Sequence, residues 1–306
     1  MKILANDGMP AKTKEMLREA NIEVDVNHYE KEELINRIKA YDILVVRSAT
    51  KVDADLIDAM EFGKTKLIIR AGVGLDNIDV EYARNKRIQV SNTPNSSSNA
   101  VAELVLGQMI TIARFMHQAN VSMRNGEWNK KEYTGVEIFG KTVGIIGFGR
   151  IGQAVAQKAS ALGMDVVFYD RYPINISGYK SVQIEELLTC SDFITIHTTA
   201  TDTPLIGESE IEIMKNGAFL INAARGNVVD ENALILALDM GKLGGAAIDV
   251  FTNEPHPNPK ICNHPKVSVT PHIGAATMEA QDRIGDEIYR LVVDFEEGFN
   301  GCHKAV

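Results

Sequence analysis

Short apolar runs alternate with charged, periodic segments over the first 93 residues of the chain. The runs have the length of strands, and the segments between them have the spacing of amphipathic helices. This alternation predicts a parallel α/β sheet. The runs expected to form its strands are Lys2–Ala5, Ile22–Val26, Ile43–Val46, Leu67–Ile69 and Ile88–Val90.

A second alternating region begins at Lys141 and predicts a second doubly wound sheet. Between the two regions, the polar stretch Ser91–Ser98 is typical of a chain turn followed by a helix N-cap. The segment from Asn99 to about Gln118 is apolar with few helix breakers, so it predicts one long buried helix. The strands expected in the second region are Val143–Ile146, Val166–Tyr169, Phe193–Ile196, Phe219–Ile221, Ala246–Val250 and Val267–Val269.

The composition is that of a globular protein with room for two domains. The chain has 306 residues, of which 45% are hydrophobic and 24% charged, so we expect an α/β protein with two doubly wound parallel-sheet domains. Its formal net charge of -9 removes the general attraction to nucleic acid or anionic lipid. An anionic substrate would therefore need locally placed cations.

Cysteine usage and the chain start bear on the compartment. Cys190, Cys262 and Cys302 are widely spaced, with no metal-finger pattern, which favours a reducing compartment and no metal site. The start Met1–Asp7 becomes polar too soon for a signal peptide, and no run approaches the roughly 18 apolar residues of a membrane span. We expect a cytoplasmic protein without membrane or nucleic-acid partners.

A glycine motif follows the first strand of the second region. Gly147, Gly149 and Gly152 form G-x-G-x-x-G between that strand and a helix-like segment. In this context the glycines permit a tight turn, close approach to a pyrophosphate and close helix–strand packing. Asp170 ends the next strand, where a carboxylate can bind the adenosine ribose and repel the 2′-phosphate of NADP. We predict NAD binding; the alternative is a plain turn with an incidental aspartate.

Three polar side chains follow later strands of the second region and should face the ligand side of the sheet. His272 is the candidate for taking a hydroxyl proton during hydride transfer, because histidine is a side chain suited to acting as a base near neutral pH. Glu254 would fix its tautomer and stabilise its protonated form, and Arg225 would anchor a substrate carboxylate. Taken singly, each also has a purely structural explanation: His272 as a loop residue, Glu254 as a turn residue and Arg225 as a surface ion-pair residue. Their joint placement after a dinucleotide motif favours catalysis.

Four stretches, Gly147–Gly152, Asn222–Gly226, Ala247–Pro255 and Thr270–Ala275, closely resemble the D-isomer-specific 2-hydroxyacid dehydrogenases. The resemblance covers nearly the whole chain and implies the same catalytic roles for the arginine, glutamate and histidine already named. It also implies further cofactor contacts, with an aspartate near the nicotinamide carboxamide; the positions concerned are Arg150, Ile151, Thr198, Ala223, Asp249 and Gly274.

The resemblance implies a domain arrangement as well. Residues 1–94 and 281–306 would form a flavodoxin-like substrate domain, into which a Rossmann coenzyme domain of residues 95–280 is inserted. The active site would lie in the cleft, and two copies would pair through the coenzyme domain as a homodimer.

Within this family the N-terminal half looks like the short-form D-3-phosphoglycerate dehydrogenases, over Val45–Val52, Arg70–Asp79 and Asn92–Asn95. Arg47 ends a strand and can reach an anion, or it forms a plain salt bridge. Backbone N–H groups near Gly74 suit a carboxylate. Lys130 and Lys131 are either phosphate ligands or surface lysines. The substrate contacts implied are Arg47, Ser48, Val73, Gly74, Asn95, Arg225 and His272.

Two departures from the family pattern change the expectation. The stretch His197–Ile206 is shorter than the family's loop and lacks its usual Pro and Leu after Thr198, so cofactor affinity could be unusual on the adenosine side. The printed chain ends at Val306, and we expect the short form, without regulatory domains that respond to serine.

The resemblance implies NAD-dependent oxidation of a small phosphorylated 2-hydroxy acid, D-3-phosphoglycerate, to 3-phosphohydroxypyruvate in the first step of serine biosynthesis. An alternative is a glyoxylate or hydroxypyruvate reductase, or another D-2-hydroxyacid dehydrogenase. A remote alternative is a non-catalytic NAD-sensing regulator, since transcriptional corepressors resemble this family.

Overall fold

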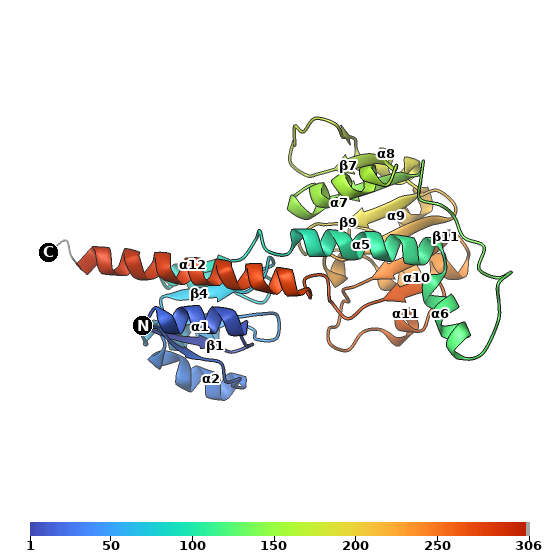
Figure 1. The fold of residues 1–306 in the computed structure, drawn as a ribbon. Coiled ribbons are helices and arrows are strands. Elements are labelled where there is room, and N and C mark those ends of the chain that lie inside the picture. The colour runs from blue at the N-terminus through green and yellow to red at the C-terminus, as the bar shows by residue number, and fades with distance from the viewer. Residues whose placement is uncertain (304–306) are drawn as a thin grey trace. The chain divides into compact units, whose positions relative to one another are not determined.

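The protein is described by a computed structural model that covers the backbone of residues 1–303 and the side chains up to residue 298. Residues 304–306 of the expected substrate domain and the side chain of Cys302 lie outside the described part. The chain divides into two compact units (Figure 1). Unit 1 combines Met1–Ser97 with the chain from Ala275 onward, and unit 2 is the continuous segment Ser98–Gly274.

Unit 1 is built on a five-stranded parallel sheet with the order β2-β1-β3-β4-β5. This is the flavodoxin-like doubly wound order, which confirms the predicted fold of the N-terminal region. Its strands are β1 (Lys2–Ala5), β2 (Glu23–Asp25), β3 (Ile43–Val46), β4 (Leu67–Arg70) and β5 (Gln89–Asn92).

Helices cover both faces of this sheet because alternate strand residues point to opposite sides. Ile3 and Ile43 share a buried cluster with residues of α1 (Ala11–Glu19) and α12 (Met278–His303). Leu4 and Leu44 belong to the cluster on the other face. The helices there are α2 (Lys31–Arg37), η1 (Ile38–Ala40), α3 (Ala54–Glu61) and α4 (Val80–Asn85).

Unit 2 is built on a seven-stranded parallel sheet with the order β12-β11-β10-β9-β6-β7-β8. The six strands β8-β7-β6-β9-β10-β11 have the Rossmann order 3-2-1-4-5-6, as predicted, and β12 adds a seventh strand beside β11. The two-residue strand β8 was not predicted. The strands are β6 (Thr142–Ile146), β7 (Asp165–Tyr169), β8 (Lys180–Ser181), β9 (Phe193–Ile196), β10 (Ala218–Asn222), β11 (Leu243–Ile248) and β12 (Val267–Val269).

Each face of this second sheet also has its own buried cluster. On one face, α5 (Ser98–Ala113) and α7 (Arg150–Ala161) pack against each other and against the strands. The other face is covered by α8 (Ile184–Cys190), α9 (Glu208–Ile213), α10 (Glu231–Asp239) and α11 (Pro259–Cys262). Within the residues that the structure describes, no helix combines the length and apolarity needed to cross a membrane.

The single helix predicted from Asn99 to about Gln118 is wrong beyond Ala113. The chain turns at Phe115, whose φ is 53°, and a separate helix, α6 (Met116–Arg124), follows. The carbonyl of Ala113 accepts the N–H of Val136, so the returning chain occupies a bond that a longer helix would use. An added Cβ at Gly135 would lie 2.2 Å from that carbonyl oxygen, so this close approach requires glycine.

Candidate active site

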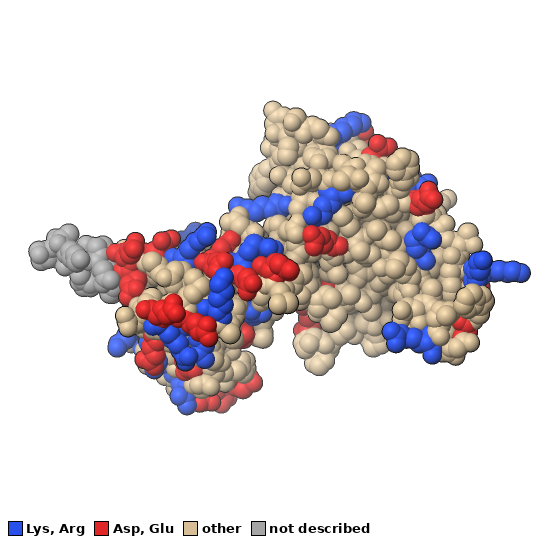
Figure 2. Space-filling view, viewed as in Figure 1, with Lys and Arg blue, Asp and Glu red and all other residues tan. Residues whose placement is uncertain are grey.

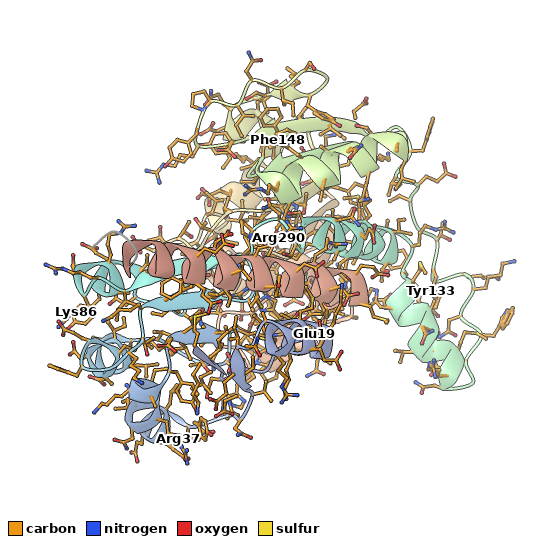
Figure 3. The ribbon with its side chains drawn as sticks, turned by 60° about the vertical axis from the view of Figure 1, so that its left-hand side comes forward. Glu19, Arg37, Lys86, Tyr133, Phe148 and Arg290 are labelled. Carbon is orange, nitrogen blue, oxygen red and sulfur yellow. The ribbon has the colours of Figure 1, made fainter. Side chains whose placement is uncertain are left out.

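The glycine loop between β6 and α7 is anchored by the aromatic residue inside it. Phe148 (labelled in Figure 3) is fully buried, and its ring stacks on Phe168 with 3.7 Å between ring centroids. Gly147 has a φ of 91°, and an added Cβ there would lie 2.6 Å from the carbonyl oxygen of His197. At Gly152 an added Cβ would lie 2.2 Å from the Gly147 oxygen. Both positions therefore require glycine.

The same loop fits the pyrophosphate of a dinucleotide. Helix α7 begins at Arg150, and no side chain caps its N-terminus, so the N–H groups of its first turn and the helix dipole are available to an anion. An added Cβ at Gly149 would meet nothing within 4 Å, which leaves space beside the backbone. The buried hydroxyl of Thr198 has no hydrogen-bond partner in the described part of the chain, as expected of a group that serves a ligand.

Asp170, the predicted ribose ligand, is hydrogen-bonded to the main chain of this loop. Its Oδ2 accepts the N–H of Phe148 at 2.7 Å, and its Oδ1 accepts the N–H of Tyr172 at 3.0 Å. Each carboxylate oxygen has a second lone-pair direction, so the predicted ribose contact is compatible with these bonds. The carboxylate also supports the shape of the loop itself.

His197, which the sequence reasoning did not single out as a functional residue, lies directly after β9. Its Nε2 is 3.0 Å from Thr195 Oγ1, and burial lowers the pKa of the imidazole to about 3. The ring is therefore neutral near pH 7 and belongs to the packing behind the glycine loop.

His272 and Glu254 form the central contact of the site. His272 Nδ1 lies 2.8 Å from Glu254 Oε2, and Glu254 Oε1 accepts the N–H of Phe251 at 2.9 Å. Burial alone would raise the pKa of Glu254, but the hydrogen bonds from His272 and Phe251 and the charges of His272 and Arg225 together lower it. The glutamate is therefore an anion near neutral pH, as its predicted role requires.

Arg225 is brought toward this pair by a close main-chain contact. The residue follows β10, and its Nη1 donates to the Ala224 carbonyl at 2.7 Å. An added Cβ at the next residue, Gly226, would lie 1.9 Å from the carbonyl carbon of Phe251. Glycine at this position thus lets the turn that contains Arg225 pack against the main chain at Phe251, three residues before Glu254.

Asp249 holds the loop that carries His272, the predicted base. The carboxylate is buried and accepts the hydroxyl of Thr270 at 2.6 Å, the N–H of Ile273 at 2.9 Å and the N–H of Gly274 at 3.0 Å. Burial raises the pKa of Asp249 despite these bonds. The main chain of His272 has a φ of 53°, and its N–H donates to the Asp249 carbonyl at 2.8 Å.

The remaining predicted cofactor positions lie at the same edge of the unit 2 sheet. Arg150 and Ile151 begin α7, and Ala223 follows β10. The N–H of Gly274 is already occupied by Asp249, so this glycine offers a ligand no free backbone donor. Lys130 and Lys131 lie in the segment after α6, and both are exposed.

The predicted substrate contacts other than Arg225 and His272 belong to unit 1. They follow β3, β4 and β5, whose parallel pairing puts them at one edge of the sheet. The guanidinium of Arg47 donates from Nη2 to Gln281 Oε1 at 2.5 Å, so Arg47 does not form the alternative carboxylate salt bridge through this bond. The others are Ser48, Val73, Gly74 and Asn95, of which all but Gly74 are exposed.

A second arginine at this edge was missed. Arg70 is the last residue of β4, in register with Val46, which precedes Arg47. Its guanidinium lies over Gly72, where an added Cβ would be 1.4 Å from Nη1. The signal was available in the sequence, because Arg70 stands at a predicted strand end just as Arg47 does.

Comparison with known proteins gives consistent results. Residues 106–274 match the family model "D-isomer specific 2-hydroxyacid dehydrogenase, NAD binding domain". The chain is 43% identical to a hydroxypyruvate reductase of Thermotoga maritima, over 95% of this chain and 97% of that protein. It is 42% identical to the D-3-phosphoglycerate dehydrogenase of Rattus norvegicus, over 97% of this chain and 57% of that protein. The crystal structure of the TT0316 protein from Thermus thermophilus matches with a TM-score of 0.90, 34% identity and 97% coverage of both chains.

The Rossmann order of unit 2 and the fit of its glycine loop define a protein that binds NAD, and the matched family model confirms that prediction. The chain belongs to the D-isomer-specific 2-hydroxyacid dehydrogenases. It spans little more than half the length of the D-3-phosphoglycerate dehydrogenases that it matches.

Proposed function

We propose that this protein catalyses the NAD-dependent oxidation of D-3-phosphoglycerate to 3-phosphohydroxypyruvate, the first step of serine biosynthesis. The contact of 2.8 Å between His272 and Glu254 carries the chemical part of the proposal. The similarity to the rat D-3-phosphoglycerate dehydrogenase supports the choice of substrate. Arg47 and Arg70 at one edge of the unit 1 sheet provide the local cations that an anionic substrate needs in an acidic protein.

The contact between His272 Nδ1 and Glu254 supports a separate role for each of the two ring nitrogens. Because Nδ1 faces the Glu254 carboxylate, the proton of the neutral ring is favoured on Nδ1, and Nε2 is left as the base. The glycine loop Gly147–Gly152 would hold NAD, which would supply the acceptor for the hydride of the substrate's C2. His272 Nε2 takes the hydroxyl proton, and Glu254 stabilises the resulting imidazolium. Arg225 holds the substrate carboxylate and the developing carbonyl oxygen.

We further propose the domain roles that the family resemblance implies. Residues 95–280 would bind the coenzyme, and residues 1–94 and 281–306 would bind the substrate. The placement of the glycine loop in unit 2 and of Arg47 in unit 1 supports this division. The free cysteines Cys190 and Cys262 suit the reducing cytoplasm that we propose as the compartment.

A homodimer formed through unit 2 is part of the proposal. On the face seen in Figure 2, charged side chains of both signs crowd unit 1, whereas unit 2 shows few. Large apolar side chains on α6 and the segment after it are each more than half exposed, which is typical of a protein interface. They are Met116, Val121, Met123, Trp128 and Phe139.

Reduction of hydroxypyruvate is a second candidate function. It is favoured by the hydroxypyruvate reductase of Thermotoga maritima, which this chain matches over nearly its whole length. Such a substrate has no phosphate and so gains less from Arg47 and Arg70.

The deciding experiment measures NADH production from D-3-phosphoglycerate and NAD, beside the reverse reactions with phosphohydroxypyruvate, hydroxypyruvate and glyoxylate. We expect preference for the phosphorylated pair. Arg47→Ala should reduce kcat/KM strongly for that pair and little for glyoxylate. A preference for hydroxypyruvate would favour the second function. NAD binding without turnover of any 2-oxoacid would leave only a regulatory role.

A further inference from the structure

Arg47 is held in place by three other residues of unit 1. Two of them fix its main chain. The Asp7 carboxylate accepts the N–H of Arg47 at 2.7 Å and both the N–H and the hydroxyl of Thr50, at 3.1 and 2.6 Å. The side-chain amide of Asn77 donates to the carbonyls of Arg47 and Thr50, each at 2.7 Å. Asp7 thus binds the N–H groups of the loop after β3, and Asn77 binds its carbonyl groups.

The third residue, Gln281, holds the side chain of Arg47. Its Oε1 accepts the Nη2 of the guanidinium at 2.5 Å, and its Nε2 donates to the Ala275 carbonyl at 3.0 Å. The second bond fixes which end of the amide faces the arginine, because only the oxygen can accept. Gln281 lies in the first turn of α12, where the Thr277 hydroxyl accepts the N–H of Ala280, so the element that carries it is capped.

The contact with Gln281 leaves one N–H group of the guanidinium without a hydrogen bond among the described residues. Arg47 Nε is buried and has no hydrogen-bond partner among the described residues, and a buried donor without a partner is costly. A guanidinium binds phosphate or carboxylate oxygens with neighbouring N–H groups. The neutral amide at Nη2 orients the guanidinium without adding a negative charge beside it, whereas a carboxylate at the same place would neutralise its positive charge.

We propose that Gln281 is a positioning residue that orients Arg47 toward the charged distal group of the substrate. It thereby sets the preference for phosphorylated over unphosphorylated 2-hydroxy acids. This inference rests on the proposed function and assigns one determinant of its substrate specificity to the first turn of α12.

The test compares Gln281→Glu with Met278→Glu. Met278 is 83% exposed on the same helix, so the control adds the same charge away from the guanidinium. Gln281→Glu should raise KM for D-3-phosphoglycerate by about tenfold or more, since a group bound through charge-assisted hydrogen bonds is lost. The kcat, the KM for hydroxypyruvate and the Kd for NADH should stay within about twofold of wild type, as should all values for Met278→Glu.

An uncharged variant keeps the inference testable if Gln281→Glu fails to fold. Gln281→Leu removes the acceptor without adding charge, and we expect it to raise KM for the phosphorylated substrate by about threefold to tenfold. Equal increases in KM for both substrates, or an unchanged ratio in both Gln281 variants, would show that the residue is only structural and would overturn the inference alone. A wild-type enzyme that does not turn over D-3-phosphoglycerate would instead overturn the proposed function, and this inference with it.

Discussion

At the scale of single residues, the proposed chemistry depends on the imidazole of His272 and on the Glu254 carboxylate beside it. His272→Ala would remove the proposed base, and we expect kcat to fall by about 10²- to 10⁴-fold. Glu254→Gln keeps the size of the side chain but removes the charge that stabilises the imidazolium, so a fall of about 10- to 100-fold is expected.

Steady-state kinetics and a separate titration with NADH test these two variants. The Kd for NADH should be nearly unchanged, because neither side chain belongs to the glycine loop. Wild-type kcat in His272→Ala would mean that the proton goes elsewhere.

His197 links stability to pH. Its pKa is about 3 in the folded protein, against an ordinary value of 6.5, because the ring is buried. As the pH falls below 6.5 the unfolded chain binds a proton that the folded chain does not, so stability is lost and continues to fall until about pH 3. From pH 7 to pH 5 this linkage amounts to about 2 kcal/mol.

Urea unfolding of wild type and His197→Asn at these two pH values isolates the effect. Wild type should lose about 2 kcal/mol more free energy of unfolding than the variant does. An equal loss in both proteins would show that the folded histidine titrates normally.

At the scale of elements, Gly226 sets the distance between the turn after β10 and the chain after β11. Gly226→Ala would put a methyl group 1.9 Å from the carbonyl carbon of Phe251, and main chain cannot rotate aside as a flexible side chain can. We expect a loss of about 1–3 kcal/mol in the free energy of unfolding, together with lower kcat/KM as Arg225 is displaced.

The matched control is Gly107→Ala in the interior of α5, where an added Cβ meets nothing within 4 Å. That change should stabilise the protein by about 0.5–1 kcal/mol, because alanine favours a helix over glycine. Unfolding in urea measures both variants. Equal stability of the two would contradict the close contact at Gly226.

The elements were predictable where their signal is local. Buried strands such as β3 and β9 are short apolar runs, and their predicted bounds agree with the structure. The break after α5 was not predictable, because Phe115 is no helix breaker and the competing hydrogen bond comes from Val136, more than twenty residues later.

In the candidate site, too, some residues were predictable from local sequence and others were not. The glycine loop and the strand-end residues Arg225 and His272 follow from motifs and from the rule that ligands bind beyond the carboxyl ends of parallel strands. Asp7 and Gln281 carry no motif. Their contacts with Arg47 depend on which strands and helices become neighbours, and the pairing of distant segments is not written in local periodicity.

At the scale of the whole molecule, the exposed apolar surface of α6 and its following segment predicts self-association. Trp128 is 77% exposed, and Trp128→Glu would place a charge in an apolar interface at a large cost. We expect wild type to sediment as a dimer and the variant to shift toward the monomer. Phe62→Glu is the control, since Phe62 is 83% exposed on unit 1 and should leave the dimer intact. A monomeric wild type would contradict the proposal.

The division of the chain also fixes an order of completion during synthesis. Unit 2 is one continuous segment, but the core of unit 1 joins Leu17 and Val45 to Ile284 and Ile288 of α12. Domains fold as units while the chain is being made, so the part translated first is the last to be finished. Until the ribosome reaches α12, one apolar face of the first sheet lacks part of its cover. Before α12 has been synthesised, the nascent N-terminal segment is therefore most exposed to aggregation and most in need of a chaperone.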